Sequence, residues 1–282
     1  MVFEWVLLAI GIVGFGAAAY WDLKTTEFPD WLPYSIIIAA LVVRAIFAFS
    51  VGDLSIIIDS IVVGVAFLAF GYALYVLKQW GDGDAWLLGS LGFLFPSVIG
   101  FTQMFPSSFP FYADQIFNFF LVAFIYLIIY SLGMGLKNPK IWKSFKKDLR
   151  KDRTSIVGII VVFSVLAISI TFYLNYMIGI PFQNMYNIFL LPVLFAFLII
   201  FIRYGKHIEQ NLFRKEISVK NLRIGDVPMD EKWRVLDKKE IQMLKKKGGK
   251  IWIKEGVRLA PVFIISMLVS LFYGNVIYAL FF

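Results

Sequence analysis

Residues 54–77 read LSIIIDSIVVGVAFLAFGYALYVL and contain one charged side chain, Asp59. About 20 apolar residues are enough to cross the hydrocarbon core of a bilayer as a helix. The alternation of polar and apolar residues that marks the strands of a membrane β-barrel is missing from this stretch. Residues 54–77 are therefore predicted to form a transmembrane α-helix.

Seven other stretches have the same character, which predicts about eight transmembrane helices. Of the 282 residues, 60% are hydrophobic and 16% charged, unlike an ordinary soluble domain. The predicted fold is an all-α polytopic membrane protein with a small cytoplasmic α+β cap before the last helix. The other predicted spans are Phe3–Tyr20, Pro33–Phe49, Ala85–Met104, Ile116–Leu136, Ile156–Ile178, Asn187–Ile202 and Leu259–Leu280.

Polar segments between the spans divide the chain into five parts. In the longest polar segment, Glu216–Ile224 has the pattern of a strand and Asp237–Lys247 that of a helix. The predicted parts are a membrane core of five helices (1–136), a basic cytoplasmic linker (137–153), two further membrane helices (154–202), a cytoplasmic subdomain (203–258) and the last membrane helix (259–282).

Positive charge is sorted to one side of the predicted membrane. The net charge is +8, and 26 of the 27 Lys and Arg residues fall in loops on one face; the remaining one, Arg44, lies inside a span. Basic residues accumulate in cytoplasmic loops. This face is therefore predicted to be cytoplasmic, and both termini are predicted to lie on the outer side of the cell membrane. Contact with anionic lipid headgroups explains the charge better than nucleic-acid binding.

Residue types missing from the chain narrow its chemistry. It has no cysteine and a single histidine, His207. Thiolate metal sites, cysteine nucleophiles and histidine clusters are thereby excluded. We predict no metal and no cofactor, and expect carboxylates to carry any chemistry.

Two carboxylates stand at the same predicted membrane depth. Asp22 follows the cytoplasmic end of the first span by two residues, and Asp84 begins the fourth span. Ionisable groups in or beside membrane spans are costly and usually functional; the plainer interpretation of Asp84 is a helix N-cap. On the outer side, Arg44 and Asp59 are predicted to form a structural ion pair across a helical hairpin, with a proton or ion relay as the alternative.

The sharpest local pattern is Trp80-Gly81-Asp82-Gly83-Asp84. Glycine lets another backbone or a ligand approach closely. Gly81 and Gly83 therefore suit pairing with an extended peptide beside Asp84. The alternative is a tight turn that requires positive φ.

These motifs resemble those of a known enzyme family. Residues 22–32, DLKTTEFPDWL, are similar to the first motif of type IV prepilin peptidases and archaeal preflagellin peptidases, in which an Asp ends the first helix and Pro-Asp follows some seven residues later. Residues 81–92, GDGDAWLLGSLG, resemble their Gly-x-Gly-Asp motif. The resemblance covers roughly residues 2–104 and the final helix. Without cysteines the chain looks like the archaeal type, although it has more spans and a larger cytoplasmic segment.

The resemblance implies an aspartyl endopeptidase with Asp22 and Asp84 as its catalytic pair. One ionised carboxylate would activate water, and the protonated one would donate to the scissile carbonyl and later to the leaving amine. The expected partners are precursor proteins with a short basic leader and an apolar helix, together with membrane lipids. Candidate substrate-binding residues besides Gly81 and Gly83 are Glu27, Asp30, Asp82 and Pro261.

Two other functions compete with this hypothesis. A proton-coupled transporter would carry acids near the bilayer midplane and show inverted repeats, whereas these acids cluster at the faces and no repeat is visible. A noncatalytic assembly protein on a peptidase-like scaffold is the second alternative. The presence of both aspartates argues against the loss of catalysis.

Overall fold

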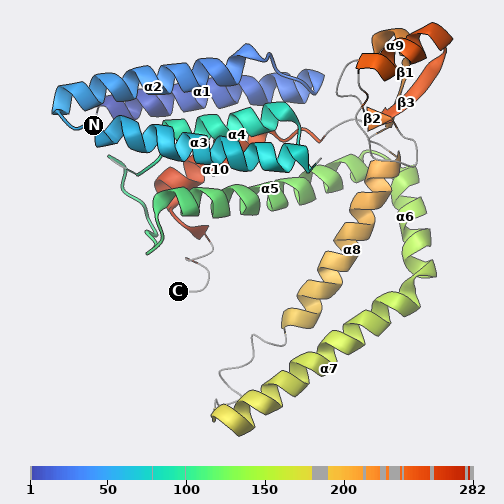
Figure 1. Cartoon of the computed structure of the whole chain (residues 1–282). Coiled ribbons are helices and arrows are strands. Elements are labelled where there is room, and N and C mark those ends of the chain that lie inside the picture. Colours follow the sequence, from blue (N-terminus) through green and yellow to red (C-terminus); the bar gives the residue numbers. More distant parts are fainter. Residues whose placement is uncertain are drawn as a thin grey trace. The chain divides into compact units, whose positions relative to one another are not determined.

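The computed structural model describes residues 2–77, 79–98, 100–179, 190–211, 214–222, 227–228, 236, 238–254, 257–276 and 279. The chain divides into two compact units, Met1–Leu127 with Gly256–Phe282, and Ile128–Glu255. Most of the described residues are helical (Figure 1). The predicted helical class is confirmed.

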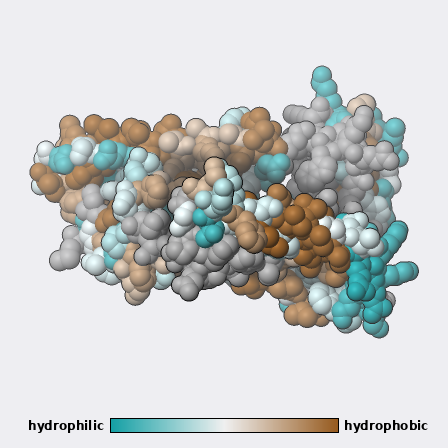
Figure 2. Space-filling view, turned by 90° about the horizontal axis from the view of Figure 1, so that it is seen from below, coloured by the Kyte–Doolittle hydropathy of each residue, from teal (hydrophilic) through white to brown (hydrophobic). Residues whose placement is uncertain are grey.

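Among the residues that the structure describes, five helices are long and apolar enough to cross a membrane. They coincide with five of the predicted spans. Four extend beyond the predicted bounds, whereas the helix predicted over 54–77 is one residue shorter at each end. Exposed apolar side chains cover much of their surface, and brown, hydrophobic areas are extensive on the face shown in Figure 2. The five are α1 (Val2–Thr25), α2 (Trp31–Val51), α3 (Ser55–Val76), α5 (Phe111–Leu136) and α7 (Arg153–Ile178).

The fourth predicted span is shorter than expected. Its helix, α4 (Asp82–Leu94), has 13 residues, so the prediction of a helix to Met104 is wrong beyond Leu94. Phe95 precedes Pro96, and a residue before proline is disfavoured in the helical conformation. Phe95 has φ −133° and ψ 74°, and its N–H still donates to the carbonyl of Leu91.

The last two predicted spans also differ from expectation. The seventh was expected to begin at Asn187, outside the described residues, and its described part is α8 (Leu190–Asn211). The final span is α10 (Ala260–Leu268) followed by a π-helical turn, η4 (Val269–Tyr273). The π-helical turn ends at Gly274, whose φ of 97° is unfavourable for a residue with a side chain. The count of eight spans stays a prediction.

Helices α3 and α4 pack closely through glycines. A Cβ added to Gly71 of α3 would lie 2.9 Å from the Cα of Ala85 in α4. Such small residues let membrane helices approach closely enough for extensive van der Waals contact. The beginning of α4, which carries Asp84, is thereby fixed against α3.

Helix α10 packs against α1 within the same unit. Phe263 of α10 stacks on Phe15 of α1 with ring centroids 6.0 Å apart, and both side chains are fully buried. A Cβ at Gly11 would lie 2.5 Å from the sulfur of Met267. The last helix therefore belongs to the core of the N-terminal helices.

The second unit contains a small sheet. Its strands β1 (Arg214–Ser218), β2 (Val227–Pro228) and β3 (Lys250–Lys254) have the order β1-β3-β2, with antiparallel pairing. Helix α9 (Lys238–Lys247) confirms the predicted helix. The predicted strand 216–224 is wrong for residues 219–221, which form the 3₁₀ helix η3 (Val219–Asn221). Residues 223–224 lie outside the described residues. Strand β3 was not predicted.

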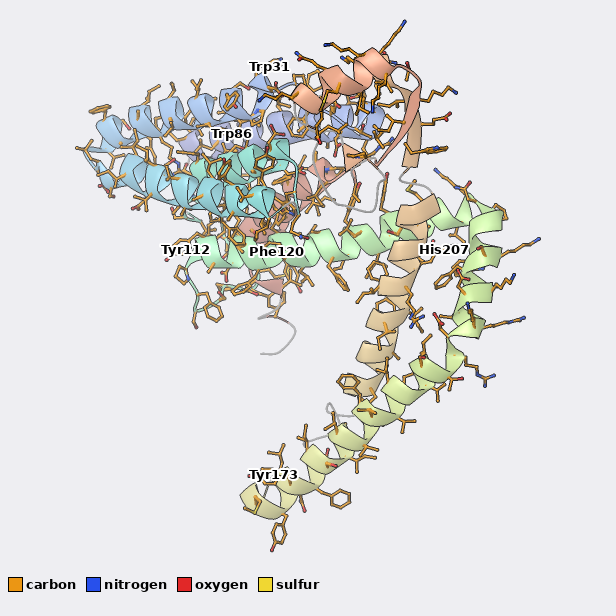
Figure 3. The ribbon with its side chains drawn as sticks, turned by 45° about the vertical axis from the view of Figure 1, so that its right-hand side comes forward. Trp31, Trp86, Tyr112, Phe120, Tyr173 and His207 are labelled. Carbon is orange, nitrogen blue, oxygen red and sulfur yellow. The ribbon has the colours of Figure 1, made fainter. Side chains whose placement is uncertain are left out.

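The basic linker forms a helix of its own, α6 (Pro139–Lys151). Phe145 of α6 packs on Tyr204 and Ile208 of α8, and Tyr204 donates to the carbonyl of Ser131. His207, labelled on α8 in Figure 3, lies 3.3 Å from the carboxylate of Asp148. The linker is therefore amphipathic, with an apolar side buried against α8.

Candidate functional site

Asp22 lies in the last turn of α1. The helix continues to Thr25, past the predicted end of the span, because the N–H of Thr26 donates to the carbonyl of Asp22 at 2.8 Å. Thr26 has a positive φ of 63°, which β-branched residues rarely adopt. Asp22 itself is only 6% exposed, so its carboxyl group needs polar partners.

One such partner comes from the far end of the sequence. The backbone N–H of Ala260, at the beginning of α10, donates to Oδ2 of Asp22 at 2.9 Å. Arg258, two residues earlier, lies close enough to act electrostatically on the same carboxylate. Sequence reasoning placed a substrate-binding residue, Pro261, in this region but predicted no contact with Asp22. The signal available in the sequence was Arg258, a basic residue just before an apolar helix.

Asp84 is the third residue of α4. Gly81 is the N-cap of this helix, so the interpretation of Asp84 as the N-cap is wrong. Asp84 lies outside the five long apolar helices and keeps partial solvent exposure. The pKa of Asp84 is raised from 3.8 to about 7. The larger cause is burial of its carboxyl group among protein atoms, and the second is the negative charge of Asp22. Asp22 and Asp84 are therefore within electrostatic reach of each other.

The two glycines differ in what surrounds them. Gly81 has an extended backbone with φ −73° and ψ 157°, and neither glycine has a positive φ; the tight-turn alternative is therefore wrong. A Cβ at Gly83 would lie 2.8 Å from Cζ of Phe28, whereas at Gly81 it would lie 3.5 Å from Oδ2 of Asp84. Of the two, only Gly83 lies so close to a neighbouring side chain that an added Cβ would displace it.

The other candidate substrate-binding residues lie on or near the same helix ends. Asp82, the first residue of α4, accepts from the N–H of Gly83 at 2.8 Å. Asp30 immediately precedes α2, and all three acids, Glu27 included, are exposed. Pro261 occupies the first turn of α10 and is partly buried. Their contact with a substrate stays a prediction.

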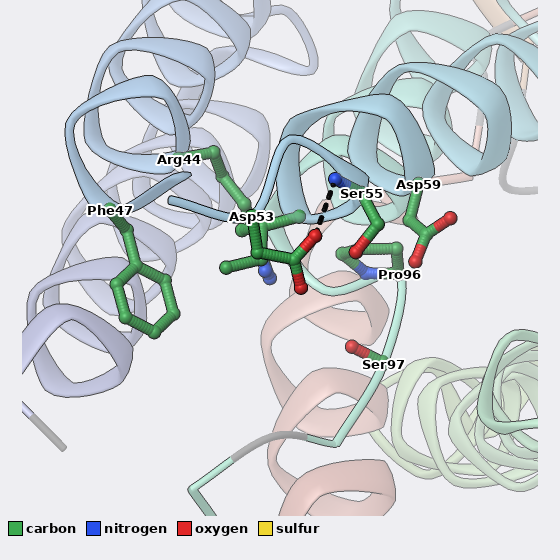
Figure 4. Close-up of a pocket in the computed structure, with 8 residues that line it drawn as sticks. Arg44, Phe47, Asp53, Ser55, Asp59, Pro96 and Ser97 are labelled. Carbon is green, nitrogen blue, oxygen red and sulfur yellow. Dashed lines mark hydrogen bonds between the residues drawn. The ribbon is translucent and has the colours of Figure 1, made fainter. Parts of the chain in front are cut away.

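Arg44 and Asp59 both line a pocket between α2 and α3, shown in Figure 4. The cavity holds about 180 Å³. Arg44 is buried and donates through Nη2 to the carbonyl of Leu94 at 2.6 Å, whereas Asp59 is exposed. The guanidinium group thus satisfies the carbonyl left free where α4 ends. The ion pair itself stays a prediction.

A buried polar cluster joins α5 to the end of the last helix. Asn118 donates to the hydroxyl of Ser270 and the carbonyl of Gly274, and its carbonyl accepts from the N–H of Val276. These bonds satisfy backbone groups freed where the helix breaks at Gly274. Within the described ranges, no group of three or more His, Asp or Glu residues gathers as for a metal ion. The cofactor prediction stays untested.

Two aspartates from separate helices lie within electrostatic reach of each other among apolar helices, and one of them accepts a backbone N–H. Residues 9–135, which contain both, match the type IV leader peptidase family. The resemblance inferred from the two sequence motifs is confirmed.

Two curated archaeal relatives agree with this match. Prepilin peptidase EppA of Methanothermobacter thermautotrophicus is 28% identical over 197 residues, which cover 65% of this chain and 49% of the relative. Preflagellin peptidase of Methanocaldococcus jannaschii is 31% identical over 87 residues, covering 31% of this chain and 37% of the relative. The chain thus spans about half or less of the relatives' length. No solved structure matches it.

Proposed function

We propose that this protein is a membrane aspartyl endopeptidase that removes the short leader of pilin-like or archaellin-like precursors. The observation that carries the proposal is the meeting of Asp22 and Asp84 within electrostatic reach, inside the segment that matches the leader peptidase family. The two relatives are named for prepilin and preflagellin processing.

The chemistry follows from two carboxylates that share one proton. Like charges close together cannot both ionise easily, so their titrations separate. In the pH range where one carboxyl group is ionised and the other protonated, the ionised group can act as a base towards water and the protonated group can donate to the scissile carbonyl. Such a pair can hydrolyse a peptide bond without a metal ion or a covalent intermediate.

The substrate class is supported by charge around the site. Glu27, Asp30 and Asp82 are exposed acids close in sequence to Asp22 or Asp84. They complement a leader rich in Lys and Arg. The apolar helix that follows such a leader would remain among the membrane-spanning helices while its N-terminal end reaches the two aspartates.

The membrane arrangement is part of the same proposal. The five long apolar helices, with α4, α8 and α10 as further crossings, give about eight spans and place both termini outside. Support comes from the 26 Lys and Arg residues on one face of that arrangement. The carboxylate pair and the 203–258 subdomain then face the cytoplasm of a cell membrane.

The proposal is tested by cleavage of a tagged pilin-like precursor in membranes. Wild-type protein should release the leader, and Asp22→Asn and Asp84→Asn should each abolish release. Asp53→Asn is the matched control, because Asp53 is an exposed acid at the α2–α3 turn. Full activity of Asp84→Asn would refute the pair, and inactive wild-type protein would favour the noncatalytic assembly protein.

Orientation is tested separately by labelling an introduced cysteine. The chain has no cysteine of its own, and Ser144 is exposed on α6. Ser144→Cys should react with an impermeant maleimide only after the cytoplasmic side is opened. Labelling of intact cells from outside would overturn the proposed orientation.

A further inference from the structure

The beginning of the last helix makes a contact with Asp22 that no sequence motif required. The N–H of Ala260 donates to Oδ2 of Asp22 at 2.9 Å, and this pair of residues is 238 positions apart. Ala260 is fully buried and Asp22 nearly so. A hydrogen bond from a buried N–H to a carboxylate favours the ionised form of the acid.

Arg258 acts in the same direction. It lies two residues before Ala260, and its positive charge reaches the Asp22 carboxylate. Ala260 is also the first residue of α10, so the positive end of the helix dipole adds to the effect. Three favourable influences on negative charge therefore converge on Asp22 from one segment.

Asp84 has the opposite surroundings. The charged groups that act on it are Asp22 and Asp82, both acids, and only the Gly81 backbone bond favours its ionisation. Burial disfavours the ionised form of both carboxyl groups, so the difference between them comes from these charged and hydrogen-bonding neighbours. Of the two carboxyl groups, Asp84 is the one that gains from keeping a proton.

We propose that residues 258–260 hold Asp22 as the ionised base of the pair and thereby leave Asp84 as its acid. Arg258 and Ala260 are positioning residues, since they act through Asp22. The assignment rests on the proposed peptidase function and deepens it. It also gives the last helix, far from both motifs in sequence, a role in the chemistry.

The assigned roles give a balanced reaction. Asp22 takes a proton from water while the water oxygen bonds to the scissile carbon, and Asp84 gives its proton to the carbonyl oxygen. In the collapse of the resulting diol, one hydroxyl returns a proton to Asp84. The proton on Asp22 passes to the leaving nitrogen as the C–N bond breaks, which restores both carboxyl groups.

The test is the pH dependence of cleavage in full-length Arg258→Gln. Loss of the positive charge should make Asp22 harder to ionise, so the acidic limb of the profile should move upward by about half a pH unit or more. Cleavage at pH 5 would then fall about three-fold or more, with little change in the maximal rate. Arg258→Lys should restore the wild-type acidic limb.

Lys24→Gln is the matched control. Lys24 lies two residues from Asp22, just as Arg258 lies two residues from Ala260, but the Lys24 side chain is exposed and interacts with Tyr20. Its replacement should therefore leave the pH profile of cleavage unchanged. If Arg258→Gln does not fold, Arg258→Met, which keeps the aliphatic length, replaces it. An equal loss of rate at every pH, or an unmoved acidic limb, would overturn the assignment. Cleavage that survives Asp22→Asn would instead overturn the proposed function.

Discussion

Replacing Asp84 by Asn should remove activity and, at the same time, stabilise the protein. Burial and the neighbouring carboxylates raise the pKa of Asp84 from 3.8 to about 7. A carboxyl group with a raised pKa contributes stability that is complete below pH 3.8 and is lost as the pH rises towards 7. Asparagine resembles the protonated acid and does not titrate, so the variant avoids this loss.

The size of the effect follows from the two pKa values. Each pH unit between 3.8 and the working pH costs ~1.4 kcal/mol until about pH 7 is reached. The loss is on the order of 1–2 kcal/mol at pH 5 and about 4 kcal/mol at pH 8, values that partial solvent exposure of Asp84 makes upper limits. The stabilisation by Asp84→Asn should therefore be greater at pH 8 than at pH 5 by ~2–3 kcal/mol.

The measurement is the thermal unfolding of both proteins in the same detergent at pH 5 and pH 8. For a chain of this size the difference corresponds to roughly 5–10 °C in Tm. Asp30→Asn, which replaces an exposed acid before α2, should show no such pH-dependent gain. An Asp84→Asn variant whose Tm gain is the same at both pH values would refute the reasoning.

Three further changes test the surroundings of the site. Gly83→Ala should lower kcat/KM of leader cleavage about tenfold, because its Cβ would lie 2.8 Å from the Phe28 ring; Gly81→Ala, with ordinary contact distances, should keep most of the activity. Thr26→Gly should stabilise the protein by ~1 kcal/mol in detergent unfolding, because it relieves a positive φ, and an unchanged Tm would contradict this. Gly71→Leu should lower Tm by several degrees, since the side chain meets the backbone of α4, and normal stability would exclude the close α3–α4 packing.

Much of the fold was predictable because membrane helices follow local composition. Five spans appear where apolar length and low charge placed them. The ends of helices depend on single residues that a hydropathy window averages out. Pro96 ends α4 early, and Gly274 ends the last helix. The helix of the basic linker was missed because its apolar residues, such as Phe145, are few and spaced among lysines.

The candidate pair was accessible from sequence because each aspartate belongs to a local motif. The partners of Asp22 were not, since Ala260 donates through its backbone and could be any residue but proline. Packing of α10 against α1, through Phe15 and Phe263, brings that N–H into place. Such long-range contacts depend on tertiary structure and leave no fixed spacing in the chain.

The central claim is that one proton shared by Asp22 and Asp84 drives peptide hydrolysis. The most direct test is kcat/KM of the wild-type protein for a pilin-like precursor, measured from pH 4 to pH 9. Since the pKa of Asp84 is raised to about 7, the acid is lost above that value, and kcat/KM should fall about tenfold per pH unit on the basic side. A rate that stays constant or continues to rise through pH 9 would contradict the account.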